Sequence, residues 1–266
     1  LDKLQNKLFL VRDRAGVKPL YYFTHENEFI FSSEIKSFHK HPKFKKEQNL
    51  EVLPYFFQFG YIPAPFTIFQ NCLKLEAGHY LEYYIENSEF KIVKYWDVTD
   101  FYLQEKFTKS ENEILKDIEK ILDDAIDLRM VSDVPVGVFL SGGYDSSLVA
   151  SILAIKQGKK INTFSVGYDE YKNYCELEYA QITANHINSN HTPVIINQKE
   201  YIKHFEETLD MLEEPHGDSA AIPLNILTKE IHKVVIKTVV SGEASDEIFL
   251  GYNNYAKVLK YYEFEK

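Results

Sequence analysis

The feature that most constrains the fold is a regular alternation of apolar strands and helical patterns in the second half of the chain. Between residues 134 and 240, short runs rich in valine and isoleucine alternate with segments of helical periodicity. Strands without polar alternation are buried on both faces, and strands separated by helices pair in parallel. The sequence therefore predicts an α/β domain with a doubly wound parallel sheet. Its strands are expected at 134–140, 161–166, 192–196 and 234–240, and its helices at 147–156, 176–187, 202–211, 221–232 and near Asp246.

The first third of the chain has a different pattern, which is typical of antiparallel β structure. Short aromatic and aliphatic runs are separated by turn residues, and an amphipathic helix begins at Glu111 after a stretch without clear periodicity. We therefore predict a first domain over residues 1–97, a linker over 98–110 and a second domain over 111–266. The strands of the first domain are expected at 8–11, 20–23, 29–31, 80–85 and 90–93.

Charge and composition argue against several classes of protein. The chain carries 30 Lys and Arg against 40 Asp and Glu, and this net charge of −10 argues against a nucleic-acid partner. No apolar stretch approaches the ~20 residues needed to cross a bilayer, and residues 2–7 interrupt any signal-peptide core. Cys72 and Cys175 have no metal-ligand spacing, so we expect reduced thiols in a cytoplasmic protein.

The most specific motif is Ser-Gly-Gly-Tyr-Asp-Ser-Ser at residues 141–147, between a predicted strand and a predicted helix. Gly142 and Gly143 let the backbone approach an anion closely, and the start of the helix offers unpaired N–H groups. No Lys follows the glycines, so the segment is not a P-loop. We interpret it as a phosphate cradle at the carboxyl edge of the sheet; the alternative is an ordinary loop.

A similar segment, Ser-Gly-Glu-Ala-Ser-Asp-Glu at residues 241–247, follows the last predicted strand. Asp145 and Asp246 then stand at the carboxyl ends of two strands, where they are suited to hold one Mg²⁺ together with substrate phosphates. The alternative is that Glu243, Asp246 and Glu247 only stabilise the start of a helix. We predict a magnesium site.

Together these motifs resemble the glutamine-dependent asparagine synthetase family, and the resemblance extends over nearly the whole chain. Residues 141–147 are similar to the signature of the pyrophosphatase-loop ATP enzymes. The other segments that carry the resemblance are Arg-Asp-Arg-Ala-Gly-Val-Lys-Pro-Leu-Tyr-Tyr at 12–22, Phe-Ser-Ser-Glu-Ile-Lys at 31–36, Lys-Leu-Glu-Ala-Gly-His at 74–79, Thr-Phe-Ser-Val-Gly at 163–167, Glu-Pro at 214–215 and Ser-Gly-Glu at 241–243.

The resemblance implies two domains. The first is the remaining part of an antiparallel α+β N-terminal-nucleophile glutaminase (a class-II amidotransferase), and the second is an adenine nucleotide α-hydrolase-like ATP domain. Asparagine would form from aspartate, ATP and glutamine-derived ammonia through β-aspartyl-AMP, with release of AMP and pyrophosphate. ATP and Mg²⁺ are the implied cofactors, and all partners are small molecules. A homodimer is compatible with the sequence, which does not decide the oligomeric state.

The resemblance also assigns roles to individual residues. Asp13 is expected in the glutamine pocket, and Glu243 is expected to support formation or breakdown of the intermediate. Asp218 and Ser219 either face the acceptor or belong to a surface loop. The residues expected to bind ATP or pyrophosphate are Leu140, Ser141, Gly142, Gly143, Asp145, Ser146, Ser147, Val166, Ser241 and Gly242.

The chain departs from the family pattern in three respects. Leu1 stands where the family has the nucleophilic Cys of the glutaminase. Ala244 and Leu250 replace glycines, so we expect a narrower loop and altered helix packing near the ATP site. A further lysine that the family uses in catalysis would lie beyond Lys266. We therefore expect a fragment that lacks both ends of a longer protein.

Other functions remain open. The same machinery can act on another carboxylate, as in β-lactam-forming or surface-polysaccharide-amidating relatives, and only the acceptor pocket would differ. A non-catalytic ATP-binding product is a further alternative. A thiolating or nucleotide-amidating enzyme of the same ATP class fits the glutaminase-like segment 12–36 poorly.

Overall fold

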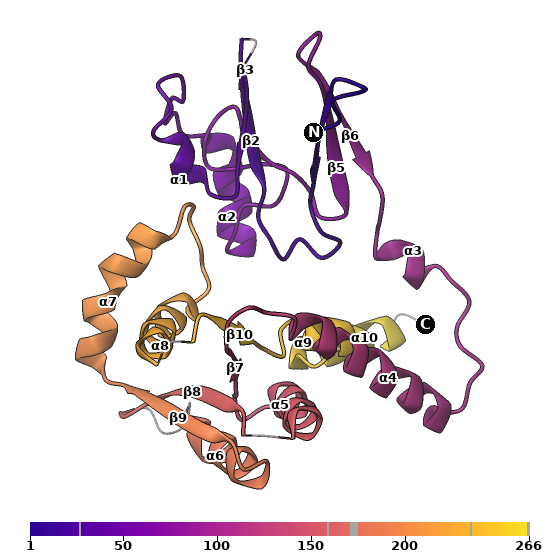
Figure 1. The fold of residues 1–266 in the computed structure, drawn as a ribbon, viewed down its shortest axis with the longest axis vertical. Helices are drawn as coiled ribbons and strands as arrows, with labels where there is room; N and C mark the ends of the chain where they lie inside the picture. Colours follow the sequence, from indigo (N-terminus) through magenta and orange to yellow (C-terminus); the bar gives the residue numbers. More distant parts are fainter. Residues whose placement is uncertain (27, 159, 171–174, 235, 265–266) are drawn as a thin grey trace. The chain divides into compact units, whose positions relative to one another are not determined.

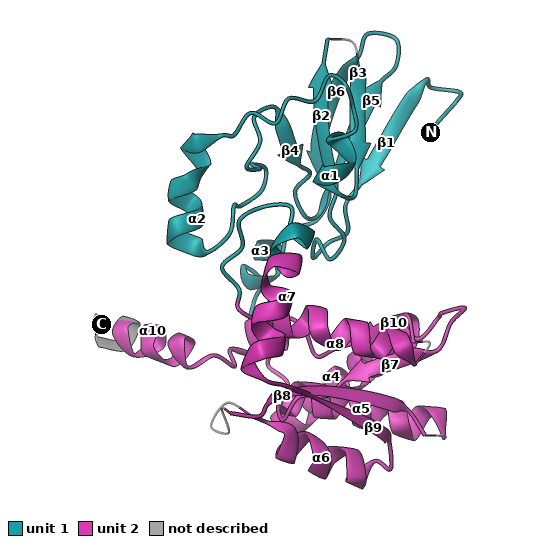
Figure 2. Ribbon diagram, turned by 90° about the vertical axis from the view of Figure 1, so that its left-hand side faces the viewer, with its two compact units in different colours: residues 1–107, 209–218 teal, residues 108–208, 219–266 magenta. Residues whose placement is uncertain are grey.

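The computed structural model describes residues 1–26, 28–158, 160–170, 175–234 and 236–264. These residues form two compact units (Figures 1 and 2). Unit 1 contains residues 1–107 and 209–218, and unit 2 contains residues 108–208 and 219–266. Among the described residues, no helix combines the length and the apolar character required to cross a bilayer.

Unit 1 is built on two three-stranded antiparallel sheets, which confirms the β pattern of the first third of the sequence. The first sheet, in the order β1-β5-β6, contains β1 (Lys7–Val11), β5 (His79–Tyr84) and β6 (Glu89–Lys94). The second, in the order β3-β2-β4, contains β3 (Glu28–Ser32), β2 (Tyr21–His25) and β4 (Cys72–Lys74). The short strand β4 was not predicted.

Short helices and aromatic side chains complete unit 1. Phe23 packs edge-on against Phe38 and Phe44, with ring centroids 5.0 and 5.1 Å apart, which shows where part of the high aromatic content is used. Burial raises the pKa of the neighbouring Cys72 thiol to about 12, and Cys175 is also a free thiol, as expected. The helical segments are α1 (Ile35–Phe38), η1 (Leu50–Val52), α2 (Leu53–Phe59) and α3 (Thr99–Tyr102).

Unit 2 contains the predicted parallel sheet. Its four strands run in the order β10-β7-β8-β9, and every neighbouring pair is parallel. The prediction placed the start of the last strand too early, because Val234 caps the C-terminus of the preceding helix; Val235 lies outside the described residues. The strands are β7 (Val136–Phe139), β8 (Asn162–Tyr168), β9 (Asn190–Ile196) and β10 (Thr238–Val240).

Helices cover both faces of this sheet, so the doubly wound architecture is confirmed. Val138 and Leu140 pack in one buried cluster with residues of α4, α5 and α6. Phe139, between them on the strand, packs in the other cluster with Leu227 and Ile231 of α8. The helices are α4 (Glu111–Arg129), α5 (Tyr144–Gln157), α6 (Leu177–His186), α7 (Gln198–Met211), α8 (Ala221–Lys233), α9 (Ser245–Phe249) and α10 (Asn253–Phe264).

Residues 209–218 leave unit 2 at the end of α7 and belong to unit 1, as the colours of Figure 2 show. We call these ten residues the crossing segment. The chain re-enters unit 2 at Ser219, just before α8 begins at Ala221. No feature of the sequence predicted this exchange.

Candidate functional site

The two loops singled out in the sequence meet at the carboxyl edge of the parallel sheet. They follow β7 and β10, which are direct neighbours in the sheet. Gly242 lies against the start of α5: a Cβ atom at this position would stand 2.8 Å from the Ser146 amide nitrogen and 2.9 Å from Asp145 Cβ. A side chain at residue 242 would therefore push the two loops apart.

A polar cavity of about 330 Å³ opens between these loops. It holds the expected pair Asp145 and Asp246, together with Glu243. Hydroxyl, backbone and carboxylate groups therefore converge on one space, which is the donor set needed to hold phosphates and a cation. The lining residues are Phe139, Ser141, Asp145, Ser146, Ser241, Gly242, Glu243, Ala244, Asp246, Glu247 and Tyr252.

A second cavity of about 300 Å³ shares Phe139 and Ser141 with the first but is mostly apolar. It is lined by Leu140, Gly142 and Val166, which were expected to contact ATP. An apolar cavity beside a polar one suits a ligand with a flat ring at one end and phosphates at the other.

Hydrogen bonds inside the first loop hold Ser141 and Ser146 together. The amide of Ser141 donates to Ser146 Oγ over 3.0 Å, and the two hydroxyl oxygens are 2.7 Å apart. The amide of Gly143 donates to Ser141 Oγ over 3.1 Å. The loop is thus ordered by its own side chains before any ligand is considered, which lowers the entropy lost on binding.

Glu176 is a residue of this site that sequence reasoning missed. Its Oε2 atom accepts a hydrogen bond of 3.2 Å from the Gly142 amide, one of the groups expected to bind phosphate. It also lines the apolar cavity, and a Cβ on Gly142 would stand 2.9 Å from Glu176 Cβ. The available signal was an acidic residue just before α6, but nothing in the sequence connects it with residue 142.

Two of the residues expected to bind phosphate, Gly143 and Ser147, do not line either cavity. The hydroxyl of Ser147 is 3.1 Å from Thr183 Oγ1 on α6, and Ser147 is absent from the lining of both cavities. Gly143 is the N-cap residue of α5 with φ −80°, and it too is absent from both linings. Their assignment to the pyrophosphate stays a prediction.

The far wall of the polar cavity is acidic. Tyr252, a residue not predicted, donates a hydrogen bond of 3.0 Å to Glu247 Oε1, and this bond together with burial raises the pKa of Tyr252 to about 12. A Cβ on Gly251 would stand 1.8 Å from Asp246 Oδ1, so the carboxylate occupies space that only glycine leaves free.

The same cavity was expected to hold Mg²⁺. Among the described residues, no group of three or more His, Cys, Asp or Glu side chains is arranged to hold a metal ion. Asp145 and Asp246 nevertheless line one cavity, and two carboxylates match the usual protein share of a magnesium site that is completed by water and phosphates. The residues present fit the ion, and the assignment stays a proposal.

Comparison with known proteins decides the family. Residues 117–265, more than half of the chain, match the asparagine synthase family, and residues 1–96 match the glutamine amidotransferase domain. The chain belongs to the asparagine synthase family.

Several named proteins are similar to this chain over nearly its whole length. A Methanocaldococcus jannaschii protein provisionally named asparagine synthetase [glutamine-hydrolyzing] 2 is 34% identical over 258 residues, which are 94% of this chain and 48% of the relative. Asparagine synthetase [glutamine-hydrolyzing] 1 of Bacillus subtilis is 33% identical over 269 residues, 100% of this chain and 40% of the relative. Amidase chry2 of Gibberella zeae is 33% identical over 268 residues, 95% of this chain and 39% of that protein. The chain thus spans half or less of the length of these relatives.

The two glycine replacements lie at the two ends of α9. Ala244 is its N-cap residue with φ 70°, and Leu250 is its C-cap residue with φ 58°. Both therefore keep the left-handed conformation that glycine adopts freely and that costs other residues energy. The structure thus shows left-handed backbone at both ends of one short helix, and the narrower loop and altered helix packing stay predictions.

In unit 1, the carboxylate of Asp13 organises its own loop. Asp13 Oδ1 accepts from the Val17 amide over 2.9 Å, and Oδ2 accepts from the Lys18 amide over 3.0 Å. Partial burial raises the pKa of Asp13, but these backbone hydrogen bonds lower it by more, so it lies below its usual value. The role of Asp13 in glutamine binding stays a prediction.

Asp218 and Ser219, predicted either to face the acceptor or to belong to a surface loop, lie on either side of the boundary between the two units in the sequence. Asp218 ends the crossing segment in unit 1, and Ser219 begins the return into unit 2. Neither is among the residues that line the two cavities described above.

Proposed function

We propose that this chain carries the nucleotide site of an enzyme that makes asparagine from aspartate, ATP and glutamine-derived ammonia. The reaction passes through β-aspartyl-AMP and releases AMP and pyrophosphate. The observation that carries the proposal is the meeting of two family loops around a polar cavity, with an apolar cavity adjoining it. The reaction takes place in the cytoplasm, uses small-molecule partners, and involves no nucleic acid.

The residues of the site divide the work between binding and alignment. The adenine ring lies in the apolar cavity against Leu140 and Val166, and the pyrophosphate lies over Ser141 and Ser146. A carboxylate is a weak nucleophile, so the enzyme must hold the acceptor in line with the α-phosphate. Glu243, on the wall of the polar cavity, acts where the intermediate forms and breaks down.

Asp145 and Asp246 are the residues that would hold Mg²⁺. When bound there, the ion supplies positive charge that stabilises the leaving pyrophosphate. In this chain the two carboxylates line the same cavity, and the absence of a side chain at Gly251 leaves the space that the Asp246 carboxylate occupies.

A second candidate keeps this chemistry and changes the acceptor. One relative with 33% identity is named an amidase rather than an asparagine synthetase, so similarity at this level does not fix the carboxylate that is amidated. The alternative is therefore an amidotransferase that acts on another carboxylate, with the same nucleotide site.

Pyrophosphate release by the full-length gene product tests the proposal, with MgATP and ammonia present and aspartate added or omitted. We expect release that depends on aspartate, together with asparagine formation. Release that requires a different carboxylate would support the second candidate. Failure to bind or cleave ATP under any of these conditions would overturn both and favour a non-catalytic protein.

A further inference from the structure

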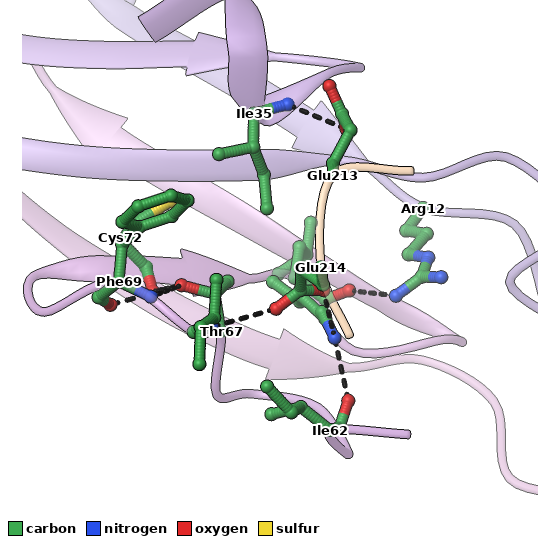
Figure 3. Close-up of polar contacts among 11 residues, drawn as sticks. Arg12, Ile35, Ile62, Thr67, Phe69, Cys72, Glu213 and Glu214 are labelled. Atoms are coloured by element: carbon green, nitrogen blue, oxygen red, sulfur yellow. Dashed lines mark hydrogen bonds and ion pairs between the residues drawn. The ribbon is translucent and has the colours of Figure 1, made fainter. Parts of the chain in front are cut away.

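Two consecutive glutamates attach the crossing segment to unit 1. Glu213 accepts hydrogen bonds from the first two amides of helix α1. Ile35 N donates to Oε2 over 2.8 Å (Figure 3), and Lys36 N donates to Oε1 over 2.9 Å. The N-cap residue of α1, Glu34, makes no side-chain capping bond of its own. Glu213 therefore caps a helix from 178 positions away in the sequence.

Glu214 makes the second attachment through a paired charge. Its Oε2 atom lies 2.6 Å from Lys74 Nζ, and only 13% of each side chain is exposed. Its Oε1 atom accepts from the Ile68 amide over 2.8 Å (Figure 3), and Lys74 Nζ also donates to the Ile62 carbonyl over 2.6 Å. Removing one partner would leave the other charge shielded from water and unpaired.

A backbone contact fixes the far end of the crossing segment. The Gly217 amide donates to the Gly60 carbonyl over 2.7 Å, and a Cβ on Gly217 would stand 3.1 Å from Gly60 Cα. The next residues along the chain are Asp218 and Ser219, for which the sequence left two roles open: contact with the acceptor or a surface loop.

The base of the crossing segment is held separately within unit 2. Asn225 of α8 donates a hydrogen bond of 2.9 Å to Thr208 Oγ1 near the end of α7, and both side chains are buried. Thr208 is thus held within unit 2 and Gly217 within unit 1, and Asp218 directly follows the held Gly217.

Three of the residues that contact the crossing segment lie in two segments that carry the family resemblance. Ile35 and Lys36 end the Phe-Ser-Ser-Glu-Ile-Lys segment, and Lys74 begins the Lys-Leu-Glu-Ala-Gly-His segment. Both segments lie in the amidotransferase match, whereas Glu213 and Glu214 lie in the asparagine synthase match. The contacts therefore join the two family matches within one compact unit.

We propose that Lys74 and Glu214 are positioning residues for the acceptor carboxylate. Their ion pair holds the crossing segment on unit 1 and thereby sets the conformation of Asp218 and Ser219. This inference rests on the proposed function and adopts one of the two roles that the sequence left open for these residues, contact with the acceptor. Lys74 and Glu214 act through the backbone and need not touch substrate.

Two substitutions remove the pair with little change in shape, and another ion pair supplies the control. Lys74→Met deletes the charge but keeps the side-chain stem, and Glu214→Gln keeps an acceptor for the Ile68 amide. Lys7 and Glu82 form a pair of the same 2.6 Å length between β1 and β5, away from the crossing segment. Lys7→Met is therefore the matched control, and Lys74→Arg tests rescue by a retained charge.

The measurement is ammonia-dependent pyrophosphate release by the full-length protein, with the KM for the acceptor and the KM for ATP determined separately. We expect Lys74→Met and Glu214→Gln each to raise the acceptor KM by about tenfold or more and to leave the ATP KM within about twofold. The double variant should resemble the single variants, since one contact is lost in each case. Lys74→Arg should restore most of the acceptor affinity, and Lys7→Met should change neither constant.

Hydrogen exchange at the Ile35, Ile68 and Gly217 amides separates this proposal from the function on which it rests. In Lys74→Met we expect faster exchange at all three amides, whether or not the protein turns over substrate. An unchanged acceptor KM, an equal effect of Lys7→Met, or retained protection at Gly217 overturns the positioning role alone. If the unsubstituted protein releases no pyrophosphate in response to any carboxylate, the proposed function fails and the positioning role fails with it.

Discussion

The two loops at the edge of the parallel sheet differ in their hydrogen bonding and in the conformation of their backbone. The first, at residues 141–147, is held by hydrogen bonds among its own serines, and its cap residue Gly143 has an ordinary φ of −80°. The second, at residues 241–247, leads into a helix that both begins and ends on non-glycine residues with left-handed backbone. The first loop therefore has a relaxed backbone, whereas the second is flanked by two non-glycine residues in a conformation that costs them energy.

The largest effect that would distinguish the loops concerns Asp145. Asp145→Ala removes a carboxylate from the polar cavity, and we expect pyrophosphate release to fall by about 10²- to 10³-fold or below detection. Asp127→Ala, which removes an exposed carboxylate of α4 in the same unit, is the matched control, and activity should change by less than about threefold. Robust activity in Asp145→Ala would sink the proposed magnesium role.

The second effect tests how closely the loops are packed. In Gly242→Ala the new Cβ would meet backbone atoms of Ser146 and Asp145 at 2.8 and 2.9 Å, so we expect about 1–3 kcal/mol lower stability and weaker ATP binding. In Gly143→Ala the nearest atom is Ser141 Oγ at 3.2 Å, a side-chain group that can adjust. Urea unfolding and ATP titration should separate the two variants; equal losses would show that the contact at Gly242 is not the tight one.

The third effect tests the strain in the second loop directly. Ala244→Gly and Leu250→Gly each relieve about 1–2 kcal/mol of left-handed strain. Glycine also increases the conformational entropy of the unfolded chain, which offsets about 0.4–1 kcal/mol of this gain. We expect a net gain in stability of about 0.5–1 kcal/mol per site, measured by urea unfolding. Ala125→Gly, inside helix α4, should instead lose about 0.5–1 kcal/mol. Losses at all three positions would contradict the strain.

The smallest effect concerns the acidic wall of the second loop. The hydrogen bond to Glu247 and burial hold the pKa of Tyr252 at about 12, above its usual value of 10.0. Because the folded pKa is raised, the stabilisation is complete below about pH 10 and is lost as pH rises towards 12. Glu247→Gln should move the Tyr252 transition down towards 10, as followed by NMR of labelled tyrosine. A transition that stays near 12 in this variant would show that the hydrogen bond to Glu247 does not cause the shift.

The sequence predicted the repeating strands of the parallel sheet and the loops that a short motif identifies. Near-continuous apolar runs marked the strands of the parallel sheet, and the carboxyl ends of β7 and β10 followed from that topology. The glycines and serines of residues 141–147 marked the loop itself. Strand β4 and helix α2 were not predicted, because segments of three and seven residues are too short to show a recognisable hydrophobic period.

The parts that could not be predicted depend on contacts between distant residues. Glu176 reaches Gly142 across 34 positions, and Glu214 reaches Ile68 across 146. An acidic side chain gives no local sign in the sequence of the amide to which it will bind. The left-handed conformation of Ala244 and Leu250 was also invisible, because their residue types argue against it.

The capping of α1 by Glu213 has a consequence for how the chain is made. Unit 1 contains residues 1–107, but the carboxylates that cap α1 and pair with Lys74 leave the ribosome only with residues 213 and 214. At about 5–20 residues per second, the roughly 110 residues in between take on the order of 5–20 s to synthesise. During that interval helix α1 lacks its Glu213 cap and Lys74 lacks its carboxylate partner, and both come from a segment encoded within the synthetase half.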